Sequence, residues 1–159
     1  MRERDLLKAI GEYVVAEGSG KEAARAQVAE ILGQCDFEAR ARVDLEDLTR
    51  QVLREVGMPC KGKQYDVIVC AVAMVAGDES LARGVGKRLY PRVAGKIQST
   101  PNGVERCVRA AIEATFDRSP PDVIERYFGN SIDWGRGKAT NVEFITRMAE
   151  VVRKRHDGR

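Results

Sequence analysis

The 159-residue chain lacks an apolar run long enough to cross a bilayer. A membrane-spanning helix needs about 20 predominantly apolar residues, and no stretch approaches that length. The N-terminus, Met1-Arg2-Glu3-Arg4-Asp5, also lacks the apolar segment of a secretory signal. We therefore expect a cytoplasmic protein without a membrane partner.

Cysteine is scarce, and its spacing shows no pairing. Four cysteines are scattered without a CxxC pair: Cys35, Cys60, Cys70 and Cys107. This spacing argues against a disulfide framework or a zinc site, and the mostly apolar neighbours favour buried free thiols. The single histidine, His156, lies in a charged tail without a nucleophile pattern, and Gly84-Val85-Gly86-Lys87 lacks Walker spacing. We expect no enzyme, and neither catalytic residues, a cofactor nor a metal.

A strong excess of one charge is also absent. The 27 lysines and arginines against 24 acidic residues give a net charge of +3, which is too small to indicate nucleic-acid binding by itself. The composition, 43% hydrophobic and 32% charged, is typical of a soluble globular protein. Residues 83–118, however, carry eight basic and three acidic residues. This local excess fits either phosphate binding or a solvated basic face.

The first 43 residues predict an N-terminal helical hairpin. Residues 4–17 and 21–32 place apolar side chains at helical spacing, and Gly18-Ser19-Gly20 separates them. Residues 33–43 are expected to form a linker or an irregular helix. Because short helices are unstable alone in water, the hairpin must pack against something. A second copy, giving a homodimer, and a different protein partner are the two candidates.

Residues 44–159 predict a second domain, an all-α helical bundle. Asp44 is expected to cap a helix over 45–56 that ends at Gly57. The valine-rich residues 65–76 have strand propensity, but their length and the lack of partner strands favour a buried helix. Asp78 is then a candidate cap for a short helix. The remaining helices are expected over residues 85–97, 101–118, 121–128 and 141–155.

Two prolines indicate a helix-turn-helix between residues 89 and 118. Pro91 interrupts the helix predicted over 85–97, so either the helix kinks there or a new helix begins with Pro91 in its first turn. Thr100 followed by Pro101 supplies an N-cap and a first-turn proline for the next helix. Both interpretations of Pro91 are compatible with two helices joined by a short polar turn.

The second helix of this motif has two distinct faces. One stripe has the spacing of a buried face: Val104, Val108, Ala111, Ile112 and Thr115. The other face carries the candidates for DNA base contact: Asn102, Glu105, Arg106 and Arg109. An arginine can donate two hydrogen bonds to guanine, and a glutamate can accept one from cytosine. The alternative is a solvated face on which Glu105 holds Arg109 through an i,i+4 pair.

Three segments together resemble the C-terminal DNA-binding domain of the stage zero sporulation response regulator. The first is Gly57-Met58-Pro59 with Lys61-Gly62; the second is Leu89-Tyr90-Pro91-Arg92-Val93-Ala94 with the segment 104–113; the third is Lys138-Ala139-Thr140-Asn141-Val142-Glu143-Phe144-Ile145. The resemblance covers about residues 45–155. It implies a bundle of about six helices that binds double-stranded DNA in the major groove, at boxes similar to TGTCGAA. It also implies that residues 118–128 contribute to contact with an RNA polymerase sigma factor.

The resemblance assigns roles to individual residues. Glu105, Arg106 and Arg109 match base-contacting positions, and the segment with Lys138, Thr140 and Asn141 lies near the DNA backbone. Further phosphate contacts are expected beside the turn and on the helix that would cross the backbone: Arg88, Arg92, Lys96 and Thr100. Lys138 and Asn141 have a second interpretation as loop and cap residues.

Two departures from the family pattern matter. Pro101-Asn102-Gly103 replaces the small, polar and basic residues usual at the start of the second helix, so sequence preference is expected to differ. About 44 residues stand where the family regulator has a receiver domain, so we expect no switch by aspartyl phosphorylation. The alternative function is a protein-interaction module or mobile-element accessory protein of the same fold, with weak or altered DNA binding.

Overall fold

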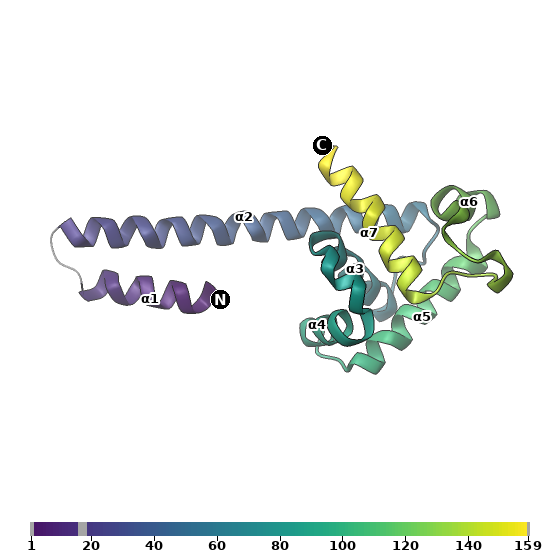
Figure 1. Ribbon diagram of the computed structural model, residues 1–159, viewed down its shortest axis with the longest axis horizontal. Helices are drawn as coiled ribbons and strands as arrows, with labels where there is room; N and C mark the ends of the chain where they lie inside the picture. Colours follow the sequence, from purple (N-terminus) through teal and green to yellow (C-terminus); the bar gives the residue numbers. More distant parts are fainter. Residues whose placement is uncertain (1, 16–18, 159) are drawn as a thin grey trace. The chain divides into compact units, whose positions relative to one another are not determined.

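The computed structural model describes residues 2–15 and 19–158, and these residues form helices and no strand (Figure 1). Within them, no helix combines the length and apolar character needed to cross a membrane. The contacts divide the chain into two units, Met1–Val43 and Asp44–Arg159. The predicted all-α fold class is confirmed.

The N-terminal unit is a pair of helices. α1 (Arg2–Val15) lies beside the first part of α2 (Ser19–Glu55). Ala9 and Ala24 are buried, and the Lys21 ammonium lies 5.4 Å from the centroid of the Tyr13 ring. Small buried side chains allow two helices to approach closely, since little volume separates their backbones. The two predicted helices are present, but Ser19 and Gly20, which were expected to separate them, belong to α2, and residues 16–18 lie outside the described part of the chain.

The predicted break after this hairpin is wrong. α2 continues from Ser19 to Glu55, so residues 33–43 are helical and Asp44 lies inside the helix instead of capping it. Gly33 costs only about 1 kcal/mol relative to alanine in a helix. The following sequence, rich in alanine, glutamate and arginine, has high helix propensity and extends a helix that already exists at low cost.

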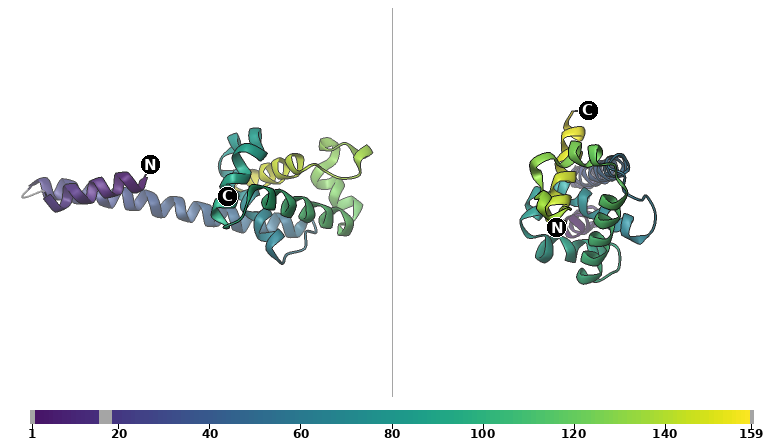
Figure 2. Two further views of the ribbon diagram at one scale, coloured as in Figure 1. Left: turned by 90° about the horizontal axis from the view of Figure 1, so that it is seen from below. Right: turned by 90° about the vertical axis from the view of Figure 1, so that its right-hand side faces the viewer.

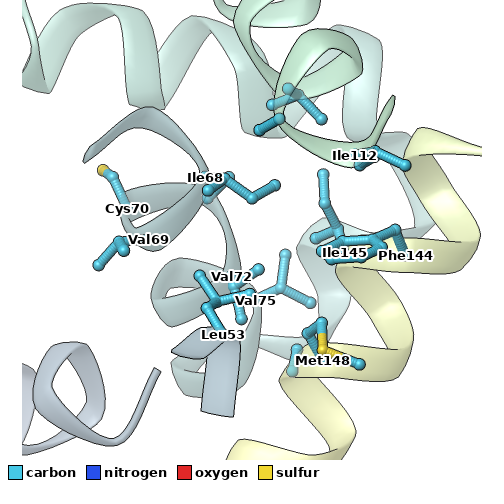
Figure 3. Packing of buried hydrophobic residues seen from close by; sticks show 14 of the residues in the cluster. Leu53, Ile68, Val69, Cys70, Val72, Val75, Ile112, Phe144, Ile145 and Met148 are labelled. Carbon is cyan, nitrogen blue, oxygen red and sulfur yellow. The ribbon is translucent and has the colours of Figure 1, made fainter. Parts of the chain in front are cut away.

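The second unit is built around α3 (Lys63–Gly77). Ten of its 15 residues are buried, and a helix that is apolar on all sides must be covered on all sides. α7 (Asn141–Asp157) and α5 (Pro101–Arg118) supply most of that cover. Figure 3 shows Ile68 and Val72 of α3 pointing toward Ile145 of α7. The prediction of a buried helix, and not a strand, is confirmed.

The other elements of this unit follow the predicted order (Figure 2). α4 (Tyr90–Lys96) precedes α5, and α6 (Pro121–Phe128) follows it. Short turns connect these helices: 3-10 helices at Glu79–Gly84, Gly129–Ser131 and Trp134–Arg136, and a π-helical turn at Val85–Leu89. The Phe128 ring packs against those of Phe116 and Phe144, with centroids 5.5 and 5.4 Å apart and ring planes tilted by 45° and 34°. This aromatic cluster joins α5, α6 and α7.

The end of α2 is fixed by a close approach of two segments. Gly57 has φ 89°, a left-handed conformation that favours glycine. A Cβ atom there would lie 2.3 Å from the Ser119 hydroxyl. That hydroxyl donates a hydrogen bond to the Val56 carbonyl at 2.5 Å. The predicted stop at Gly57 is confirmed, and the structure adds that its missing side chain makes room for Ser119.

An ion-pair network holds the end of α2 to α6 and α7. The Arg155 guanidinium donates to both carboxylate oxygens of Glu55, at 2.9 and 2.6 Å, and the Tyr127 hydroxyl donates to Glu55 at 2.6 Å. The hydrogen bond from Arg155 is the main cause that lowers the pKa of Glu55 from 4.5 to about 2. The carboxylate is therefore charged at neutral pH and ties three helices together.

All four cysteines are free thiols, but they differ in exposure. Cys70 is buried in α3, and that burial raises the pKa of its thiol. Cys35 and Cys107 are half-buried. Cys60 is exposed, which contradicts the expectation that the thiols are buried, because it lies in the loop after α2 and not on the inner face of a helix.

Candidate nucleic-acid interface

The first helix of the motif begins at Tyr90, with Pro91 in its first turn. Leu89, the residue before Tyr90, also has helical backbone angles (φ −75°, ψ −53°), so Pro91 lies where a π-helical turn passes directly into an α-helix. The π-helical turn at Val85–Leu89 was not predicted. It leads into the helix without a gap and holds Arg88 on the surface.

A tight turn separates α4 from α5. The amides of Ile97 and Ser99 donate to the carbonyls of Val93 and Ala94, at 3.0 and 2.9 Å, which ends α4. Between them Gln98 has φ 52°, the left-handed conformation that terminates many helices. The turn therefore fixes the direction in which α5 leaves.

The start of α5 is capped as predicted. The Thr100 hydroxyl oxygen accepts a hydrogen bond from the Gly103 amide at 3.1 Å, and Pro101 occupies the first turn. A Cβ at position 103 would lie 3.1 Å from that same oxygen and 3.0 Å from the Ser99 hydroxyl. Glycine at 103 therefore lets the turn pack tightly. The cap leaves the Thr100 hydroxyl proton available as a donor.

The two predicted faces of α5 are present. The stripe expected to be buried is buried: Val104, Val108, Ala111, Ile112 and Thr115. Asn102, Arg106 and Arg109 are exposed, and Glu105 is half-buried. Among the residues that the structure describes, Arg106 has no hydrogen-bond or ion-pair partner. Its five N–H donors are therefore all open to a ligand.

Glu105 and Arg109 form the i,i+4 pair that was the alternative to base contact. A guanidinium nitrogen of Arg109 lies 2.7 Å from the Glu105 carboxylate. Both side chains are more than two-fifths exposed, so the pair is screened by water and contributes little to stability. Arg109 keeps further donors, and Glu105 keeps a second oxygen, so the pair does not exclude base contact.

The basic side chains around α4 are exposed and make few contacts with the rest of the protein. Arg88 donates to the carbonyl of Ser80 at 3.2 Å, and Arg92 lies 3.6 Å from Asp78. Asp78 caps the following 3-10 helix as predicted, accepting from the Ser80 amide. These contacts orient the cations and leave most of their donors free.

Lys96, the last residue of α4, pairs with Glu46 of α2. The lysine side chain remains 49% exposed. An ammonium group has three donors, so the contact with Glu46 does not consume its capacity to bind a phosphate. No local pattern could predict this pair, because the two residues are 50 positions apart.

Hydrogen bonds fix the segment that leads into α7. The Thr140 hydroxyl accepts from the Glu143 amide at 3.3 Å, and the Glu143 carboxylate accepts from the Thr140 amide at 2.7 Å. This reciprocal capping box lowers the pKa of Glu143, chiefly through the Thr140 backbone. The Asn141 amide donates to the Tyr90 hydroxyl at 3.0 Å. Thr140 is therefore the N-cap of α7, and Asn141, the first residue of that helix, is anchored to Tyr90 through its side chain.

Lys138 joins this segment to α5 beside its exposed face. Its ammonium lies 2.7 Å from the Glu113 carboxylate, and both side chains are nearly half exposed. The hydrogen bond from Lys138 lowers the pKa of Glu113, so the pair is charged at neutral pH. Glu113 lies one helical turn after Arg109, so Lys138 is held beside the predicted base-contacting residues.

A surface hollow of about 660 Å³ collects many of the predicted residues. Its lining includes Glu105 and Arg109 from α5 and Lys138, Thr140 and Asn141 from the segment before α7. Asn102, Arg106, Thr100 and the basic residues around α4 do not line it. Several other lining residues were not predicted as site residues, among them Arg136 and Val142. Arg136 precedes Lys138 in a glycine-rich loop, and its charge was the available signal.

A known protein family matches the part of the chain that carries this arrangement. The family described as Sporulation initiation factor Spo0A C terminal matches residues 49–152, about two thirds of the chain. The chain belongs to this family. The Spo0A C-terminal match includes the whole helix-turn-helix, the hollow and the start of α7. The family consists of DNA-binding effector domains, and the predicted resemblance is confirmed. α1 and most of α2 lie outside the matched residues.

Proposed function

We propose that the protein is a sequence-specific regulator of transcription that binds double-stranded DNA in the cytoplasm. The observation that carries this proposal is the exposed face of α5, where Arg106 has no partner among the described residues. An unpaired arginine on a capped helix after a tight turn is suited to bidentate contact with guanine. Membership of the Spo0A C-terminal family supports the same conclusion.

Base readout is assigned to the four exposed or half-exposed residues at the start of α5. Arg106 and Arg109 would donate to guanine, Glu105 would accept from cytosine, and Asn102 would contact the base nearest the turn. These residues share one face of the helix, opposite the buried stripe. They can therefore enter one groove together without unpacking the core.

Phosphate contact is assigned to two groups of residues on either side of that face. Arg88, Arg92, Lys96 and Thr100 belong to α4 and the turns around it, and Lys138, Thr140 and Asn141 precede or begin α7. Several of these cations pair with partly exposed carboxylates. A phosphate would replace or share those partners at small cost, because exposed ion pairs contribute about 0–1 kcal/mol.

The test is a binding titration of the full chain at salt concentrations from about 50 to 200 mM. A duplex containing a TGTCGAA-like box is compared with a scrambled duplex of equal length. A preference of about a thousandfold supports a sequence-specific regulator. Equal and steeply salt-dependent affinities would contradict sequence-specific binding to this box, and absence of binding would favour the protein-interaction module.

The N-terminal unit supports a homodimer as part of this function. Leu7, Ile10 and Val14 lie three and four residues apart on α1 and are 63, 41 and 73% exposed. A helix with such a stripe is stabilised when another helix covers it. A second copy of the hairpin offers the same stripe, and a four-helix bundle would bury both.

Light scattering after size exclusion tests the homodimer. Ile10→Asp in the full chain should reduce a dimeric mass to that of the monomer, because it places a charge in the apolar stripe. Glu12→Ala, on the other side of α1, is the control and should leave the mass unchanged. A mass that is monomeric for the unaltered chain would contradict the dimer.

Contact with an RNA polymerase sigma factor is proposed for α6. This helix presents Asp122, Glu125 and Arg126 to solvent, outside the hollow. Its inner face is fixed by Ile124 and Phe128 in the core. A Glu125→Ala, Arg126→Ala double variant should lose binding to purified sigma factor and retain DNA affinity. Unchanged binding to sigma factor would contradict the assignment.

A further inference from the structure

One exposed apolar side chain in the DNA-binding unit has no structural explanation. Val142 is 47% exposed, and it is the single large hydrophobic residue so exposed among the described residues of Asp44–Arg159. The other large hydrophobic residues with this exposure belong to α1 and α2 of the N-terminal unit. Valine also has lower helix propensity than alanine, so local structure does not require it here.

The position of Val142 is fixed by its neighbours. It is the second residue of α7 and follows Asn141. The side chain of Asn141 donates a hydrogen bond to Tyr90, and Thr140 before it is the N-cap of the helix. The capping box holds the backbone on both sides of Val142. Its isopropyl group is therefore presented by a rigid element, which is a requirement for discriminating between ligands that differ by one methyl group.

Val142 lines the same hollow as Glu105 and Arg109. The hollow thus combines polar groups that can bond to base edges with the exposed isopropyl group of Val142, whereas its other aliphatic lining residues, Val85, Ile112 and Ala139, are buried. Double-stranded DNA entering against α5 would bring its major-groove edge to this hollow. On that edge the one apolar substituent of the four bases is the 5-methyl group of thymine.

We propose that Val142 recognises a thymine in the bound site by packing against its 5-methyl group. This inference rests on the proposed DNA-binding function and adds a specificity-determining residue outside the helix-turn-helix. Removing both apolar groups from water stabilises the complex. The gain expected for one buried methyl group corresponds to about a fourfold increase in affinity.

The experiment compares thymine with deoxyuridine, which differs only by the missing methyl group. A duplex is first selected from a random library by the unaltered full-length protein. Each thymine in it is then replaced singly, and the affinities of the unaltered protein and of Val142→Ala are measured. At one position the replacement should weaken the unaltered protein about fourfold and leave Val142→Ala unaffected. The salt dependence should be the same for both proteins, because no phosphate is involved.

Val15→Ala serves as the matched control, since this valine is 81% exposed, is the last residue of α1 and does not belong to its apolar stripe. It should respond to deoxyuridine as the unaltered protein does. Identical responses of Val142→Ala and the unaltered protein at every thymine would overturn the inference while leaving the DNA-binding function intact. Failure of the unaltered protein to select any sequence would overturn both.

Discussion

The side-chain amide of Asn141 donates a hydrogen bond to the phenolic oxygen of Tyr90 at 3.0 Å. The bond joins the first residue of α7 to the first residue of α4, although the two are 51 positions apart. Tyr90 is otherwise buried, and this burial raises the pKa of its hydroxyl. The contact therefore fixes the segment before α7 to the first helix of the DNA-binding motif.

Replacing Tyr90 by phenylalanine should lower the free energy of unfolding by about 1 kcal/mol, because the Asn141 amide loses its partner. Urea denaturation monitored by circular dichroism measures the change. Asn141→Ala should have a similar effect, and the double variant should lose less than the sum of the two. Strictly additive losses would show that the hydrogen bond does not contribute.

Arg106→Ala should weaken binding to the preferred duplex by about 1 to 3 kcal/mol and relax the choice of base at one position. The reason is that its donors are all free to bond to a base edge. Binding to scrambled DNA should change much less. Arg118→Ala, an exposed arginine at the end of the same helix, is the matched control. Equal losses of affinity for the preferred and the scrambled duplex would contradict the assignment of Arg106 to base readout.

Lys96→Ala should weaken binding to every sequence alike and reduce the slope of affinity against salt by about 1, because it removes one phosphate contact. Glu46→Gln should act in the opposite direction by releasing the Lys96 ammonium from its carboxylate partner. Fluorescence anisotropy over a salt series measures both. A loss confined to the preferred duplex would contradict a phosphate contact.

Acid should destabilise the fold through Glu55. Its pKa is lowered from 4.5 to about 2 in the folded protein, so its contribution is complete above about pH 4.5 and is lost as the pH falls toward 2. Because the carboxylate is 38% exposed, screening limits the contribution to about 1 kcal/mol.

Glu55→Gln is the test of this pH dependence. The difference in unfolding free energy between Glu55→Gln and the unaltered protein should be largest near neutral pH and shrink below pH 4.5, measured by urea denaturation at each pH. A difference that is constant from pH 7 to pH 2 would rule out this carboxylate as the titrating group.

Local signals in the sequence predicted the helix-turn-helix well. Pro91, Thr100 and Pro101 act through their own backbone geometry, and the apolar stripe of α5 depends on spacing within one helix. These features need no knowledge of distant residues. The same holds for the stop at Gly57, whose conformation is typical of a helix end.

Features that depend on competition or on distant contacts were not predictable. The break expected at Gly33 fails because the helix propensity of the residues after it outweighs the cost of one glycine. The pairing of Lys96 with Glu46 joins residues 50 positions apart, and only the packed structure brings them together. The position of Val142 in the same hollow as Glu105 and Arg109 likewise depends on the packing of α7 against α5.

The graded exposure of the four thiols makes the chain suitable for chemical labelling. Cys60 is open to an alkylating reagent in the native protein, whereas the Cys70 thiol in α3 can react only when the core around that helix opens. With Cys35, Cys60 and Cys107 replaced by serine, the rate at which the remaining thiol is alkylated would report how often the DNA-binding unit opens, and by how much bound DNA slows that opening.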